Sequence, residues 1–172
     1  GIDGGFDLPS ELFPHQKSCV EFALRAGCAA LFLDTGLGKT LSALAWGREI
    51  VRHTGKPVLM LAPLGVVAQH KAEADAYGIE AIACRDGQFT GATIVITNYE
   101  RLHLFDVSRF AGVILDESSI LKSFSGQTTK ALIEQFSRTT YRLCCTATPA
   151  PNDHTELGTH AEFLGVMKRD QM

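Results

Sequence analysis

The apolar positions along the chain fall into short runs, separated by polar or glycine-containing segments. Six of these runs have the length and composition of β-strands, and they cover residues 29–33, 58–62, 79–84, 93–97, 113–116 and 141–146. Several are apolar at nearly every position, which is typical of strands buried on both faces of a parallel sheet. The pattern therefore predicts a sheet that is covered by other elements on both sides.

Helical periodicity fills most of the gaps between these runs. Apolar residues recur every three to four positions in 41–51, 66–77 and 127–136, and a similar pattern over 16–25 precedes the first strand. Strands that alternate with helices are typical of a parallel sheet with helices on both faces. We therefore expect a single α/β domain over residues 1–172, in three layers, with its ligand at the carboxyl ends of the strands.

Composition narrows the class of protein. Hydrophobic residues make up 45% of the chain and charged residues 20%, with a net charge of −3, so a disordered chain is excluded. A mildly acidic chain lacks the overall positive charge that many nucleic-acid binders have, but a local basic patch is compatible with it. No apolar stretch approaches the roughly 20 residues that span a bilayer, so we expect no membrane partner.

The five cysteines follow no disulfide or metal-binding spacing. Their number is odd, no CxxC pair occurs, and the adjacent Cys144 and Cys145 lie in an apolar run, where we expect core residues. Such cysteines are typical of a reducing compartment. We therefore expect a protein of the cytoplasm, or of the nucleus if it is eukaryotic, and not a secreted one.

The stretch LDTGLGKTLSALAWG, which starts at Leu33, has the composition of a phosphate-binding loop between a strand and a helix. Gly36 and Gly38 allow backbone N–H groups to turn toward an anion at the positive end of that helix. Lys39 is then expected to reach the β- and γ-phosphates, and the Thr40 hydroxyl to ligate Mg²⁺. The pattern GxxxxGK[ST] lacks its first glycine, which leucine replaces. A glycine-rich turn with a surface lysine is the alternative interpretation.

An acidic pair follows a later apolar run, in VILDESS. Asp116, at the end of the expected strand, is predicted to hold Mg²⁺ as the Walker-B acid of phosphate-loop enzymes does. Glu117 beside it is expected to take a proton from an attacking water. A kinase needs no second carboxylate to activate water, so the pair favours hydrolysis. Two solvated loop acids are the alternative.

Five segments, in order, resemble the motifs of superfamily-2 helicases. DTGLGKT, LAPLGVVAQH, ITNYERL, ILDESSILKS and CTATPAPND stand in the places of motifs I, Ia, Ib, II and III. In detail they are most similar to the Swi/Snf-related DNA-dependent ATPases, in a bacterial or phage branch. The resemblance covers residues 12–164. It implies the N-terminal RecA-like lobe of a P-loop NTPase, with ATP and Mg²⁺ as its ligands.

The resemblance also implies roles for the positions that match the motifs. Gln16 resembles the glutamine that reads the adenine edge, Asp116 the Mg²⁺-holding acid and Glu117 the general base. The residues that resemble the triphosphate cradle are Thr35, Gly36, Leu37, Gly38, Lys39 and Thr40. The residues that resemble the motif linking nucleotide state to the nucleic-acid face are Thr146, Ala147 and Thr148.

Two further segments, 63–69 and 97–101, stand where the family grips the backbone of a DNA strand. Contacts of this kind carry no sequence information, so binding is expected to be non-specific and salt-sensitive. The side chains predicted to take part are Pro63, Gln69, Thr97, Asn98 and Arg101. Ordinary loop polarity is an equally good interpretation. The neighbouring His70 and Lys71 fit solvated helix residues just as well.

Two departures from the family bear on function. Ser119 stands where many relatives have the histidine that helps to couple ATP to nucleic acid, which leaves the strength of coupling open. Only about two dozen residues follow CTATP, too few for the second RecA-like lobe that supplies the family's arginine finger. We therefore expect ATP–Mg²⁺ binding with weak or no turnover by this lobe alone. The expected partners are DNA, double-stranded and held by its backbone, and a second lobe of the parent protein.

Two other functions stay open at this point. A non-catalytic module that binds nucleotide and nucleic acid fits the same loop, although Glu117 argues against it. A small-molecule kinase also uses a phosphate loop, but the arginines of this chain form no evident cluster that resembles a lid.

Overall fold

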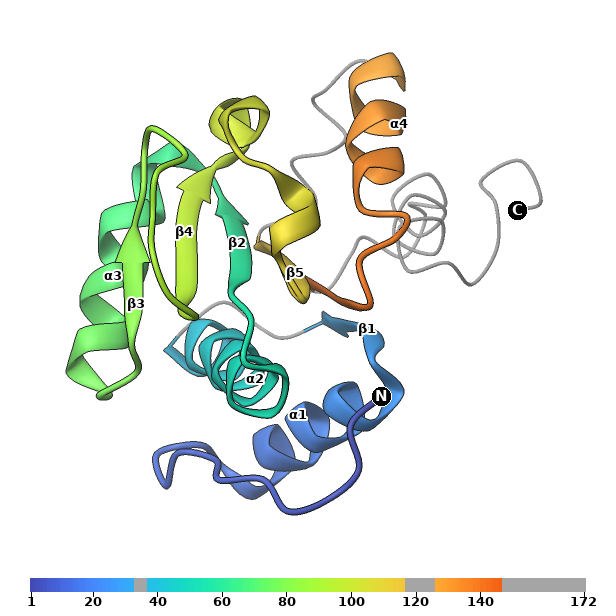
Figure 1. Ribbon diagram of the computed structural model, residues 1–172. Coiled ribbons are helices and arrows are strands. Elements are labelled where there is room, and N and C mark those ends of the chain that lie inside the picture. The colour runs from blue at the N-terminus through green and yellow to red at the C-terminus, as the bar shows by residue number, and fades with distance from the viewer. Residues whose placement is uncertain (33–36, 117–125, 147–172) are drawn as a thin grey trace.

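A computed structural model describes residues 1–32, 37–116 and 126–146 (Figure 1). Within these ranges, six strands form one all-parallel sheet in the order β1-β6-β5-β2-β4-β3. The strands are β1 (Cys28–Phe32), β2 (Val58–Ala62), β3 (Ala81–Ala83), β4 (Ile94–Asn98), β5 (Gly112–Asp116) and β6 (Tyr141–Thr146). Each strand overlaps one of the six apolar runs, so the predicted parallel sheet is confirmed.

Four α-helices and three 3₁₀ segments join the strands in the described part of the chain. They are α1 (Pro14–Ala26), α2 (Leu37–Thr54), α3 (Val67–Ala76), α4 (Gly126–Gln135), η1 (Leu64–Val66), η2 (Tyr99–Leu104) and η3 (Val107–Arg109). Helix α1 begins at a proline, whose fixed φ suits a first helical turn, and is followed by Gly27, whose φ is 82°. The predicted helices are all present, and the 3₁₀ segments are additional to them.

Helix α2 begins earlier than the apolar periodicity indicates. The periodicity predicts a start at Leu41, whereas the helix starts at Leu37. After Leu37 its first turn contains Gly38, Lys39 and Thr40, which carry no apolar signal, so the pattern could not reveal it. As a result Lys39 and Thr40 belong to the N-terminal turn of the helix, where backbone N–H groups have no carbonyl partner within the helix and can bind an anion.

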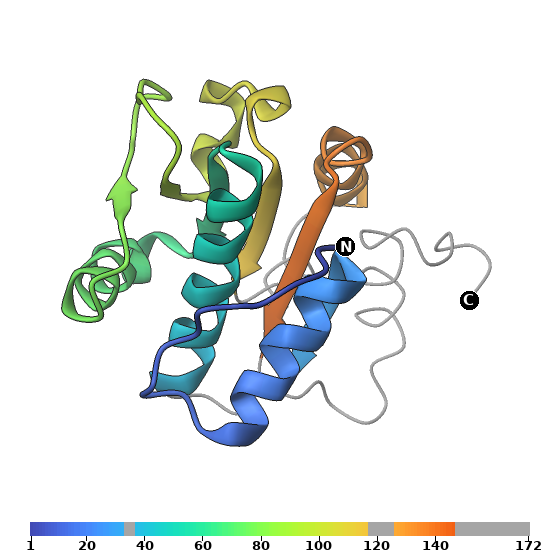
Figure 2. The same cartoon turned by 60° about the horizontal axis from the view of Figure 1, so that its bottom comes forward.

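Alternate residues of the strands face opposite sides of the sheet, and each side has its own core. Val58 and Met60 of β2 pack with α1, α2 and α3, in a core that includes the fully buried Trp46 of α2. Leu59 and Leu61 pack on the other side with α4 and the segments η2 and η3. Figure 2 shows α1 and α2 on one face of the sheet and α4 on the other. The predicted three-layer α/β/α arrangement is therefore confirmed.

The register brings the carboxyl ends of neighbouring strands together. Phe32 pairs with Thr146, and Cys145 pairs with Asp116, so the ends of β1, β6 and β5 lie next to one another. Strand β2 pairs with β5 on its other side, so the chain that leaves β2 for α3 starts beside the end of β5. This edge of an open parallel sheet is where ligands bind, and it carries the predicted motifs.

Candidate nucleotide-binding site

Asp116 is at the centre of a buried polar cluster on the carboxyl edge of the sheet. It ends β5, and only 1% of its surface is exposed. Lys39 Nζ, from α2, lies 3.5 Å from its Oδ1, and His70 Nε2, from α3, lies 2.6 Å from its Oδ2. The Tyr99 hydroxyl, from η2, donates to its main-chain oxygen at 2.8 Å. Three separate elements therefore hold this one residue.

Lys39 is buried, with 5% of its surface exposed. An ammonium group is rarely buried without an anionic partner, and Asp116 is such a partner. The lysine also lies in the first turn of α2, so its charge adds to the positive end of the helix dipole. Lys39 is thus not the surface lysine of the alternative interpretation, and it shares one site with the predicted metal-binding acid.

Gln16 of α1 lies directly against the start of α2. Its Oε1 accepts a hydrogen bond from the Phe13 N–H at 2.8 Å, which holds the side-chain amide in place. A Cβ atom on Gly38 would lie only 1.9 Å from Gln16 Nε2, so any larger residue there would displace the glutamine. In the same turn, the Ser42 hydroxyl donates to the Gly38 carbonyl at 2.5 Å. The predicted adenine-reading residue and the predicted phosphate loop therefore meet.

The cluster has oxygen atoms that fit a magnesium ion. Thr40 is buried in the first turn of α2, and Asp116 Oδ1 is buried and accepts no hydrogen bond from the described residues. A buried oxygen without a donor is costly, and a hydrated cation would satisfy it. No group of three or more His, Cys, Asp or Glu side chains in the described ranges could hold a metal. Such a group suits Zn²⁺, whereas Mg²⁺ is bound through one or two carboxylates with phosphates and waters.

His70 is buried, with 5% of its surface exposed, so the interpretation as a solvated helix residue is wrong for it. It lies one helical turn before the buried Ala74, on the face of α3 that packs against the sheet. The spacing of Val67, His70 and Ala74 was the signal in the sequence that this face points inward. Lys71, by contrast, pairs with Asp75, whose side chain is exposed.

Tyr99 is the second residue that sequence reasoning missed. It lies in ITNYERL, between positions predicted to contact DNA, and its ring packs in the core on the η2 side of the sheet. Its hydroxyl crosses from the end of β4 to the end of β5. The sequence holds no signal for this hydrogen bond, because it depends on which strands are neighbours at the sheet edge.

The first nucleic-acid segment follows β2. Pro63 precedes η1 and is half-buried, and Leu64, the first residue of η1, is largely exposed, at 64%. Gln69 is exposed on α3, next to the buried His70. This segment therefore has exposed side chains close to the Asp116 cluster. Its contact with DNA stays a prediction.

The second nucleic-acid segment follows β4. Thr97 and Asn98 are buried at the end of the strand, and Asn98 Nδ2 donates to Glu100 Oε2 at 2.6 Å. Arg101 is half-buried, and its guanidinium donates to the main-chain oxygen of Arg85 at 3.0 Å. The roles of these residues in DNA binding also stay predictions.

Several predicted site residues lie outside the described part of the chain or are described only in part. The residues outside it are Thr35, Gly36, Glu117, Ala147 and Thr148. Leu37 begins α2 and Thr146 ends β6, and only their backbone is described.

The cysteines are all free, and Cys144 and Cys145 are buried in the core, as predicted. Burial raises the pKa of the Cys144 thiol well above its ordinary value. Among the helices of the described ranges, none combines the length and apolar character needed to cross a membrane.

A model of the SNF2-related domain family matches residues 15–171 of the chain. None of the curated proteins matches it. Among solved structures, the SWI2/SNF2 ATPase core of Sulfolobus solfataricus in complex with double-stranded DNA is similar, with a TM-score of 0.77 and 21% identity, over 95% of this chain and 38% of that one.

Two helicases have a similar fold. The UvsW helicase of bacteriophage T4 has a TM-score of 0.73 and 13% identity, over 93% of this chain and 60% of that one. The Hef helicase domain of Pyrococcus furiosus has a TM-score of 0.69 and 19% identity, over 88% of this chain and 36% of that one. At these identities the likeness shows the fold, and the chain spans less than two thirds of each of these structures.

Proposed function

Since the chain belongs to the SNF2-related domain family, we propose that it is the ATP-binding motor lobe of a DNA-dependent ATPase, a helicase or a translocase on double-stranded DNA. The observation that carries the proposal is the buried Lys39–Asp116 pair at the N-terminal turn of α2. A buried lysine at a helix start, facing a carboxylate oxygen that accepts no hydrogen bond from the described residues, suits the phosphates and metal of a nucleotide.

Each part of the site has a defined task in this proposal. Gln16 presents its amide to the adenine edge, and the first turn of α2 with Lys39 holds the phosphates. Thr40 and Asp116 would hold Mg²⁺, which neutralises the charge that develops on the β- and γ-phosphate oxygens. Glu117, the next residue in the chain, accepts a proton from the attacking water.

The proposed partners are double-stranded DNA and a second RecA-like lobe. The likeness to an archaeal SWI2/SNF2 core solved with double-stranded DNA supports the first. The exposed Leu64 and Gln69, and the half-buried Arg101 after β4, would supply the contact surface, since Thr97 and Asn98 are buried. The second lobe supplies the positive charge that completes catalysis, so this lobe alone turns over slowly or not at all.

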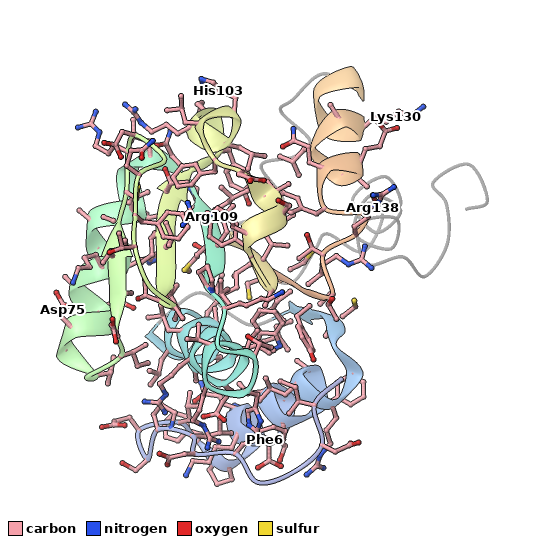
Figure 3. The ribbon with its side chains drawn as sticks, in the orientation of Figure 1. Phe6, Asp75, His103, Arg109, Lys130 and Arg138 are labelled. Atoms are coloured by element: carbon pink, nitrogen blue, oxygen red, sulfur yellow. The ribbon has the colours of Figure 1, made fainter. Side chains whose placement is uncertain are left out.

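Replacement of Lys39 by alanine tests the proposal. In the protein that joins this chain to a second lobe, Lys39→Ala should lower DNA-stimulated ATP hydrolysis by about 100-fold or more, because a charge that stabilises the transferred phosphate is lost. Phosphate release, measured with and without duplex DNA, is the readout. The matched control is Lys130→Ala, since Figure 3 shows Lys130 pointing outward from α4.

Hydrolysis that survives Lys39→Ala, or wild-type hydrolysis that does not respond to DNA, would contradict the proposal. The non-catalytic binding module is separated by a second variant, Glu117→Gln. In an active motor this variant should trap bound ATP, because the base that activates water is gone while the phosphate site is intact. In a module without catalysis, the lifetime of bound ATP should be the same in the variant and the wild type.

A further inference from the structure

We propose that His70 and Tyr99 transmit the state of the nucleic-acid segments to Asp116, and so couple DNA binding to the nucleotide site. The inference rests on the proposed function and adds to it a route between the two ligands. Each residue contacts Asp116 directly, and each belongs to an element that begins at one of the segments predicted to contact DNA.

The contact from His70 sets the direction of the Asp116 side chain. An ionised carboxylate only accepts hydrogen bonds, so His70 Nε2 donates to Oδ2. The distance of 2.6 Å is short for a nitrogen donor, and both side chains are buried, which strengthens the interaction. With Oδ2 held by His70, Oδ1 is the oxygen left toward Lys39.

The contact from Tyr99 sets the position of the Asp116 backbone. Its hydroxyl donates to the Asp116 main-chain oxygen at 2.8 Å, at the point where β5 ends and the chain continues into Glu117. His70 and Tyr99 thus fix the side chain and the main chain of the same residue separately. A shift of either donor changes how Asp116 is presented to a nucleotide.

Each donor also adjoins a surface that DNA would touch. His70 directly follows the exposed Gln69 on α3, and Leu64, in η1 at the start of this segment, is exposed. Tyr99 precedes the exposed Glu100 and the half-buried Arg101 in η2. Binding that moves α3 or η2 therefore moves a donor on Asp116, with no intervening side chain. Partners of a metal-binding carboxylate are typically worth about 10- to 100-fold in affinity or activity.

This route answers a question that the sequence left open. Ser119 stands where many relatives have a histidine that helps to couple ATP to nucleic acid, and in this chain His70 of α3 contacts Asp116. A purely structural role for His70 and Tyr99 makes a different prediction. In that case a variant with the same shape would change stability, and the two ligands would still affect each other as in the wild type.

The test measures the affinity for duplex DNA with and without a non-hydrolysable ATP analogue and Mg²⁺, at an analogue concentration that saturates each variant. The protein is the one that joins this chain to a second lobe. The ratio of the two affinities is the coupling factor, typically about 5- to 150-fold between coupled ligands. Tyr99→Phe removes only the hydroxyl, His70→Leu removes the donor, and Tyr77→Phe at the end of α3 is the control.

We expect Tyr99→Phe and His70→Leu each to reduce the coupling factor by about 5-fold or more, while DNA affinity without nucleotide stays within about 3-fold of the wild type. His70→Gln, whose amide keeps an N–H donor, should restore part of the factor. Tyr77→Phe should leave it unchanged. If His70→Leu does not fold, Tyr99→Phe decides the matter alone, because its ring stays in the core.

Two failures are distinguishable. Wild-type coupling that persists in Tyr99→Phe and in any folded His70→Leu overturns this inference and leaves the motor function standing. A wild-type protein in which DNA and nucleotide do not affect each other, and in which DNA does not stimulate hydrolysis, overturns the proposed function and the inference with it.

Discussion

Two carboxylates are buried in the described ranges, and their partners have different origins. The partners of Glu49 lie on its own helix, α2. Arg52 donates two hydrogen bonds to Glu49 Oε2, at 2.6 and 3.2 Å, and His53 Nε2 lies 3.5 Å from the same atom. Asp116 takes its partners from α2, α3 and η2. Each residue keeps one oxygen, Glu49 Oε1 or Asp116 Oδ1, that accepts no hydrogen bond from any described residue.

The origin of the partners indicates what each carboxylate does. Arg52 also donates to the main-chain oxygen of Gly5, so the Glu49 cluster fastens the N-terminal segment to α2. The hydrogen bond to Glu49 raises the pKa of Arg52, so this cation keeps its charge. Asp116 instead lies at the sheet edge where ligands bind, and elements that meet only in the folded lobe orient it. The partners of Glu49 lie within one turn of its helix, which indicates a structural ion pair. The partners of Asp116 come from several elements, which indicates a ligand-binding site.

The largest expected effect comes from removing the charge of the site carboxylate. Asp116→Asn should lower DNA-stimulated hydrolysis by about 100-fold or more, because the oxygen proposed to hold Mg²⁺ loses its charge. Steady-state phosphate release, in the protein with its second lobe, is the measurement. The matched control is Asp75→Asn, an exposed carboxylate on α3 whose pair with Lys71 is screened by water. Equal turnover in the two variants would place the metal elsewhere.

The structural carboxylate should show the opposite pattern. Glu49→Gln replaces the carboxylate that Arg52 faces with a neutral amide, so the attraction between opposite charges is lost, and should lower the free energy of unfolding by about 1–3 kcal/mol. ATP turnover at a temperature where the variant is folded should not change. Urea unfolding measures the first and phosphate release the second, with the exposed Glu134→Gln on α4 as the control. A loss of turnover without a loss of stability would remove the distinction between the two carboxylates.

The smallest effect is expected at Asp106, which is exposed and has partners two residues away. Its Oδ1 accepts from the Ser108 hydroxyl at 2.6 Å and from the Ser108 N–H at 3.1 Å, and these hydrogen bonds lower its pKa below the ordinary 3.8. A lowered pKa stabilises the folded state above the unfolded pKa, and this contribution is lost as pH falls through the folded value. Asp106→Asn should therefore shift the urea midpoint slightly at about pH 7, and the shift should shrink as the pH falls through the folded pKa of Asp106. A shift that persists in acid would indicate a lost cap and not a lost charge.

The sheet could be predicted from the sequence because its strands are apolar on both faces. Residues 58–62 and 113–115 are apolar at every position, and both form strands as predicted. The only change is that β5 starts one residue before the predicted 113–116. The start of α2 was harder, because Gly38 and Lys39 have no apolar periodicity. The motif order located Asp116 and Lys39, and the folded chain places Lys39 Nζ 3.5 Å from Asp116 Oδ1.

The rest of the site could not be predicted because it depends on contacts across the sheet edge. Tyr99 lies in a segment that the family resemblance associates with DNA, and His70 lies next to such a segment, so neither was predicted to contact Asp116. Gln16 was placed by its position before the loop strand, but its packing against Gly38 depends on how closely α1 and α2 approach. Contacts between side chains that meet only when the strands pair cannot be predicted from a single sequence.

Strand β1, which leads into the phosphate loop, pairs within the described sheet only with β6. As the chain is synthesised, β1 emerges before the other strands and β6 after them. Strand β1, which leads to Lys39, therefore has no strand of the described sheet to pair with until β6 has left the ribosome. Pairing between such distant segments is slow and exposes surfaces that aggregate. The order of synthesis therefore keeps the sheet edge that carries the Lys39–Asp116 pair incomplete until β6 has been made.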